Sequence, residues 1–176
     1  MKIVHIFADK LFAIQYDDEE IDELERLFDE WQDLEYLENF FEEHKADLKS
    51  GFYSSEIIEN AVLNTFEEAK SLRTQLDELS EYSLESLFKP LDNLEYRSVL
   101  LSKRKAYGNR HKSWLRLYAI RIEKDMYVIT GGAIKLTSSM DERLHTQKEL
   151  NKLEKCRNWL KEEGLINPEA FTELET

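Results

Sequence analysis

The sequence predicts an α+β fold in which an antiparallel β-sheet of four or more strands carries helices packed on one face. Two regions, 1–16 and 94–136, are rich in β-branched and aromatic residues and contain short turn signals, a pattern typical of strands. Helical spacing of apolar residues fills most of the remaining sequence. With 176 residues and 41% hydrophobic content, the chain can bury one sizeable core, so we expect a single domain over residues 1–176.

The N-terminal half begins with a predicted hairpin, in which residues 1–7 and 11–16 form strands around a tight turn at Ala8-Asp9-Lys10. From residue 19 the apolar period becomes helical, and Asp17 with Glu20 has the spacing of a capping box. This helical pattern continues to Ser50, where Gly51 can end it. After Ser54-Ser55, a second apolar stripe predicts a long helix as far as Leu79.

The C-terminal half predicts a meander of strands over 94–103, 114–123 and 126–136, with a loop at Gly108-Asn109 and a turn at Lys124-Asp125. We interpret Gly131-Gly132 as a bulge or a strand bend, because the pair is too short and wrongly placed for a phosphate-binding loop. Ser139 and Glu142 have capping-box spacing and predict a final helix that ends near Gly164.

Charge is divided sharply along the chain, although the net charge is −13. Residues 1–96 carry 8 Lys and Arg against 26 Asp and Glu, a balance of −18, whereas residues 97–161 carry 16 against 6, a balance of +10. The positive pole of such a dipole can steer a polyanion towards a molecule that is an anion overall. The simpler alternative is that acidic residues only solvate exposed helix faces.

The most suggestive segment for function is the run KRKAYGNRHK at residues 103–112, which combines phosphate-binding cations with rings that can stack on bases. In the strand that follows, period-2 alternation predicts an aromatic and basic face opposite an apolar face. A basic hairpin tip that only confers solubility, with the rings covered by a helix, is the alternative. The candidate RNA-binding residues in this region are Lys103, Arg104, Lys105, Tyr107, Arg110, His111, Lys112, Trp114 and Tyr118.

Other chemistries have little support in the sequence. The four histidines show no HxH or HExxH arrangement and Cys156 is the single cysteine, so we expect neither a dedicated metal site nor an internal disulfide. No cofactor is expected, since the chain has no nucleotide-binding glycine motif. The N-terminal sequence does not resemble a signal peptide and no apolar run is long enough to span a bilayer, so we expect a cytoplasmic protein without a membrane partner.

Metal-independent RNA cleavage requires groups that activate the 2′-OH, stabilise the charged phosphorane and protonate the leaving oxygen. Arg, Lys, His and Tyr side chains are sufficient for this chemistry. If the sheet is concave, residues from several elements can converge on one strand of RNA. The set comprises Arg116 and Arg121 on one strand, Lys135 on the next, His111 in the loop before them and His145 on the final helix.

Three features of residues 84–165 are similar to those of a known family: a Pro-Leu motif at Pro90 before a strand containing Tyr96-Arg97, the strand WLRLYAIRIE, and the segment MYVITGGAIKLT. In these features the chain resembles the RelE/HigB/ParE superfamily of bacterial toxin–antitoxin systems. The resemblance implies a ribonuclease toxin that cleaves mRNA, ribosome-bound in some members, and a cognate antitoxin that covers the site. It implies phosphate-contacting and catalytic roles for Arg116 and Lys135, with Arg97, Arg121 and His145 as further candidates.

The chain departs from that family in its greater length, its acidity and its lone Lys135 where the family has paired lysines. We expect residues 17–50 to be an acidic helical insertion and residues 166–176 an acidic tail. The competing interpretation is a noncatalytic interaction protein whose acidic helices bind a basic partner or mimic nucleic acid, because residues 17–43 contain 14 acids and one basic residue, Arg26. A third is a phage-derived protein that keeps the toxin fold without its chemistry.

Overall fold

A computed structural model describes all residues except 51–52, 54–55, 79–82, 92–99, 110–111 and 176. Its centre is a six-stranded sheet in the order β1-β2-β6-β5-β4-β3. The fold class is therefore α+β with a mostly antiparallel sheet, as the sequence predicts. The strands are β1 (Lys2–Phe7), β2 (Leu11–Gln15), β3 (Lys89–Pro90), β4 (Ser102–Tyr107), β5 (Leu115–Glu123) and β6 (Met126–Ile134).

The predicted hairpin at the N-terminus and the β5–β6 hairpin are both confirmed. A single parallel pairing, between β2 and β6, joins the first hairpin to the meander, and it extends only as far as Ala13 opposite Ile129. The register between β5 and β6 shifts beside Gly131, which confirms the predicted bulge. The predicted strand over 94–103 lies mostly outside the described residues, and β4 begins only at Ser102.

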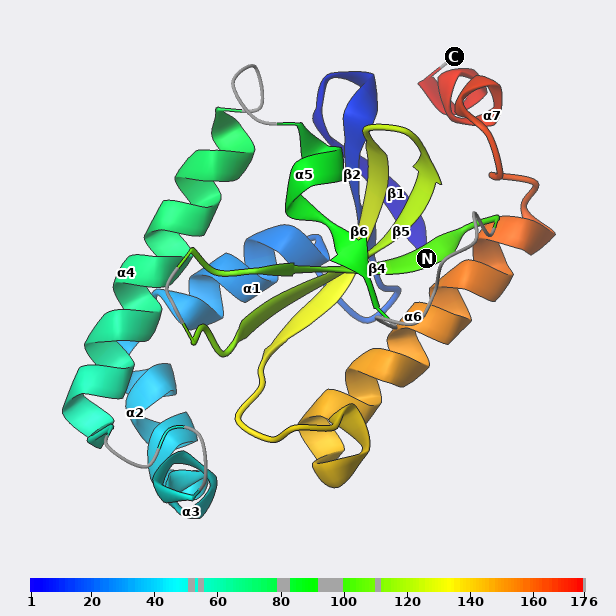
Figure 1. Cartoon of the computed structure of the whole chain (residues 1–176). Helices are drawn as coiled ribbons and strands as arrows, with labels where there is room; N and C mark the ends of the chain where they lie inside the picture. The colour runs from blue at the N-terminus through cyan, green and yellow to red at the C-terminus, as the bar shows by residue number, and fades with distance from the viewer. Residues whose placement is uncertain (51–52, 54–55, 79–82, 92–99, 110–111, 176) are drawn as a thin grey trace.

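Helices cover both faces of the sheet, so the expectation of helices on one face is wrong (Figure 1). The reason is that the central strands are buried on both faces and supply two apolar surfaces. One face carries α1 (Glu23–Trp31), α2 (Leu34–Glu43), α3 (Lys45–Lys49), α4 (Ile58–Asp77) and α5 (Leu84–Leu87). The other carries α6 (Leu144–Glu162) and α7 (Pro168–Thr172).

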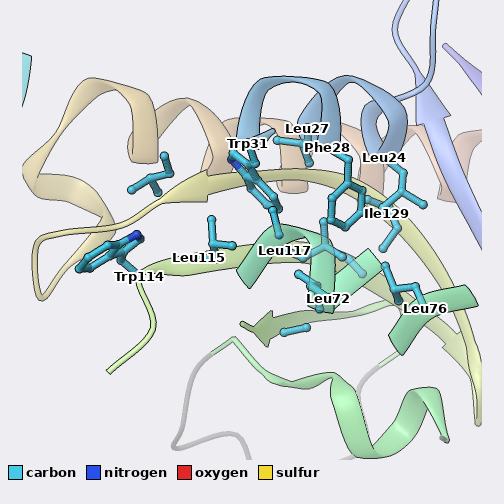
Figure 2. Packing of buried hydrophobic residues seen from close by; sticks show 14 of the residues in the cluster. Leu24, Leu27, Phe28, Trp31, Leu72, Leu76, Trp114, Leu115, Leu117 and Ile129 are labelled. Atoms are coloured by element: carbon cyan, nitrogen blue, oxygen red, sulfur yellow. The ribbon is translucent and has the colours of Figure 1, made fainter. Parts of the chain in front are cut away.

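The acidic region 17–50 is divided into three helices, where the sequence predicts continuous helical spacing. The first helix begins later than expected, because Asp22 rather than Asp17 caps it by accepting from the backbone N–H groups of Leu24 and Glu25. Asp33 caps α2 in the same way. Figure 2 shows how α1 directs its apolar side chains towards the sheet; the α1 residues in this cluster are Leu24, Leu27, Phe28 and Trp31.

On the opposite face, α6 packs Leu153, Cys156 and Leu160 against the sheet. The predicted capping box at Ser139 and Glu142 is confirmed, but it caps a 3-10 turn (Met140–Glu142) that precedes α6. The predicted acidic tail contains α7, whose Phe171 is buried. Among the described residues, no helix is both long and apolar enough to cross a membrane.

Candidate functional site

Three predicted cationic residues gather at one end of the sheet, on the face that carries α6. In the β4–β5 register, Lys105 lies opposite Tyr118 and Tyr107 lies opposite Arg116, so the pleat directs these four side chains to the same face. Lys135 follows β6 directly, and its backbone N–H continues the ladder to the carbonyl of Trp114. We call Lys105, Tyr107, Arg116 and Lys135 the basic cluster.

Arg116 is held by contacts other than ion pairs. Its Nη1 donates to the backbone carbonyls of Ser113 and Leu115, at 2.8 Å each, and its guanidinium lies 4.0 Å from the ring centroid of Tyr107. The Tyr107 ring is itself exposed at the surface. No carboxylate of the described residues pairs with Arg116, so its charge remains available to an anion.

Lys135 shares this environment. Its Nζ donates to the carbonyls of Thr137 and Ser138 at 2.8 and 2.7 Å. Burial, together with the neighbouring charges of Arg116 and Lys105, lowers the pKa of Lys135 below its usual value. Like charges brought this close produce a concentrated positive potential, which favours binding of a phosphate.

The other cations of the segment 103–112 do not all join the cluster. Lys103 forms an ion pair with Glu154 of α6 at 2.5 Å. Arg104 lies opposite Ala119, on the other face of the sheet, and its Nε donates to Ser102. Lys112 lies in the loop before β5 with a left-handed backbone, φ 61°. The predicted residues Arg97, Arg110 and His111 lie outside the described residues.

The prediction that Trp114 and Tyr118 form an exposed stacking surface is wrong, because each side chain is only 1% exposed. Trp114 precedes the first residue of β5 and so does not follow its alternation. Its indole packs in the α1–α4 layer, where Nε1 donates to Thr65 Oγ1 at 2.8 Å. Tyr118 does share the face of Arg116, but α6 and the strands around it cover the ring.

The predicted convergence of Arg121 with Arg116 is also wrong. Arg121 lies on the opposite face, where it and the hydroxyl of Tyr127 donate to the carboxylate of Glu85. These hydrogen bonds outweigh the effect of burial and lower the pKa of Glu85. His145 lies in an aromatic contact with Phe40 and His44, and its Nε2 is 2.8 Å from the carbonyl oxygen of Ile134.

The structure also contains a polar site that the sequence did not indicate. A cleft of about 1000 Å³ between α1, α2 and α6 is lined by the buried carboxyl groups of Glu23 and Glu149, beside Arg26 and Lys152. In the sequence, Glu23 and Glu149 are indistinguishable from the many exposed acids around them. The only local signal was the Gly131-Gly132 pair, of which Gly131 lies against both carboxyl groups.

The described residues contain no group of three or more His, Cys, Asp or Glu side chains placed to hold a metal ion. The basic cluster offers three cations and the exposed phenol ring of Tyr107. Comparisons with protein-family models, with curated proteins and with solved structures found no match for this chain.

Proposed function

We propose that the protein is an RNA-directed, toxin-like protein that binds single-stranded RNA at the basic cluster. The observation that supports this most directly is the position of Arg116 and Lys135, two cations without a carboxylate partner among the described residues, beside the exposed ring of Tyr107. Phosphates would bind the two cations and a base would stack on the ring, the combination used for unpaired RNA. A cognate antitoxin would then cover this surface.

Cleavage is the further step of this proposal. Lys135, whose pKa is lowered by burial and by Arg116, is the group best placed to exchange a proton with the bound strand. Arg116 would stabilise the charge that develops on the phosphorane. Neither Arg121 nor His145 takes part, since the first is bound to Glu85 and the second lies against Phe40 and His44.

Binding is tested by fluorescence anisotropy with a short single-stranded RNA at several salt concentrations. Three cations in contact with phosphates give a slope of about −2 for log affinity against log salt. We expect Arg116→Ala/Lys135→Ala to reduce the slope to about −0.7. The matched control, Lys124→Ala/Lys161→Ala, removes the same charge from exposed positions elsewhere and should keep the wild-type slope. Equal loss in both variants, or no binding by the wild type, contradicts the proposal.

Toxicity is tested by expressing the wild type and the Arg116→Ala/Lys135→Ala variant in a bacterial host while growth and the ends of cellular mRNA are followed. Growth arrest with new mRNA ends in the wild type alone supports a ribonuclease toxin. RNA binding without new mRNA ends supports the proposed RNA partner and contradicts the proposed cleavage.

A second candidate is a noncatalytic interaction protein that uses the acidic helices. The observation in its favour is that α1 and α2 bury most of their apolar residues in the core and leave a dense carboxylate surface in solvent. A variant with Glu35→Gln, Glu38→Gln and Glu42→Gln, three exposed positions of α2, should lose affinity for a cationic peptide if this surface is the binding site. The RNA proposal expects this variant to keep its RNA affinity.

A further inference from the structure

The helices α1 and α6 lie on opposite faces of the sheet, yet they meet around one edge of β6. Beyond Ile129 this edge has no strand partner in the register with β2. The hydroxyl of Tyr16 donates to the Thr130 carbonyl there, at 2.7 Å. Lys152 of α6 then bridges the two helices, since its Nζ lies 2.9 Å from Glu23 Oε2 and 3.2 Å from Glu149 Oε1.

Both carboxyl groups at this junction are more than nine-tenths buried, with side-chain exposures of 2% for Glu23 and 8% for Glu149. Glu149 Oε2 has no hydrogen-bond partner within the described part of the chain. The missing side chain of Gly131 makes room for it, because a Cβ there would stand 1.9 Å from Glu149 Oε2 and 3.3 Å from Glu23 Oε2. The junction therefore brings the oxygens of two carboxyl groups to the same small space.

The charges of the junction balance only if Glu149 is neutral. Arg26 donates to both oxygens of Glu23, at 2.8 and 2.9 Å, and to Glu30 at 2.5 Å. With Lys152, this gives two cations against the carboxylates of Glu23 and Glu30. A carboxylate at Glu149 would be a third negative charge, buried and uncompensated by these two cations, and an uncompensated buried charge is costly.

We propose that Glu149 carries a proton directed from Oε2 towards Glu23, and that this proton holds α1 and α6 together at the edge of β6. Loss of the proton places two carboxylates side by side, weakens the junction and widens the cleft between the helices. The inference concerns a site separate from the basic cluster and does not depend on RNA binding.

The pH range over which the junction weakens follows from the groups that face Glu149. Burial is the main cause that raises the pKa of Glu149 to about 7, and Glu23 of α1 adds to it, while Lys152 and Arg26 act in the opposite direction. The hydroxyls of Tyr16, of Tyr36 on α2 and of Tyr118 on β5 also face it. Below pH 4.5 the carboxyl is protonated in the closed and the open junction alike. Between about pH 4.5 and 7 only the closed junction keeps the proton, so the closed junction becomes less stable relative to the open one as the pH rises. Above about pH 7 both have lost the proton, and the relative stability no longer changes with pH.

Cys156 provides the measurement, because it is the single cysteine, is fully buried and lies one helical turn after Lys152. Its rate of reaction with a neutral thiol reagent, divided by the rate of the unfolded chain at the same pH, reports opening of the junction. We expect this protection to fall about tenfold in the wild type between pH 6 and pH 8.5. Glu149→Gln keeps the neutral form and should show no such fall.

The matched control is Glu154→Gln, an exposed position of the same helix, which should show the wild-type fall. Carbon-13 NMR of the glutamate carboxyl groups in the wild type gives an independent readout, with one carboxyl expected to titrate near pH 7 and to disappear from the spectrum in Glu149→Gln. A fall of equal size in Glu149→Gln, or titration of Glu149 near pH 4.5, would overturn the inference.

Discussion

Gly132 is the position where one added methyl group should have the clearest effect on stability. A Cβ at this position would stand 2.7 Å from the backbone carbonyl oxygen of Arg116 and 2.9 Å from carbon atoms of both Leu27 and Trp31. The carbonyl belongs to the neighbouring strand, so it cannot move without changing the spacing of β5 and β6. Overpacking of this kind costs about 1–3 kcal/mol, reduced by about 0.4–1 kcal/mol because alanine restricts the unfolded chain.

The measurement is urea unfolding of Gly132→Ala followed by circular dichroism. We expect a net loss of about 1–2 kcal/mol in the free energy of unfolding with an unchanged m-value, and a Tm lower by roughly 2–8 °C. Gly131→Ala is the comparison, because its methyl would meet the carboxyl oxygen of Glu149, which ends a flexible side chain. A Gly132→Ala variant as stable as the wild type would refute the close packing of α1 on β6.

Three further predictions concern buried polar groups. Because its pKa is raised, Glu149 lowers wild-type stability as pH rises from about 4.5 to 7, so Glu149→Gln should be more stable than the wild type at pH 8, by up to about 3 kcal/mol in urea unfolding. Glu85→Ala leaves the buried hydroxyl of Tyr127 without its acceptor and should cost about 1–3 kcal/mol, measured by thermal unfolding. Trp114→Phe and Thr65→Val break the same hydrogen bond, so their costs should be less than additive in the double variant.

Local pattern was sufficient for most of the elements. Period-2 alternation and turn residues predicted the hairpins, and the capping box at Ser139 marked the approach of the last helix, because each signal lies within a few residues of the structure it determines. The predicted start of the first helix was wrong for a related reason. Three aspartates, Asp17, Asp18 and Asp22, lie in front of it, and side-chain type alone does not decide which one caps the backbone.

Part of the candidate site could also be derived from alternation. Arg116 and Arg121 lie five positions apart, and an odd offset already places them on opposite faces of a regular strand. The pairing of Tyr107 with Arg116 needed the β4–β5 register as well, since Gly108-Asn109 marks a loop but does not set the register of the strands on either side. Trp114 lies one residue before β5 begins, so its side chain does not follow the alternation of the strand. The sequence locates the start of a strand only to within one or two residues and so could not predict this.

The sequence by itself determined the α+β class, the order of most elements and the division of charge along the chain, because these depend on composition and on neighbours in the chain. Only the tertiary structure decided that both sheet faces are covered and that Glu23 meets Lys152, 129 residues away, at the edge of β6. A buried acid and a solvated acid have the same place in a local pattern. What distinguishes them is the long-range packing that removes water from one and leaves it around the other.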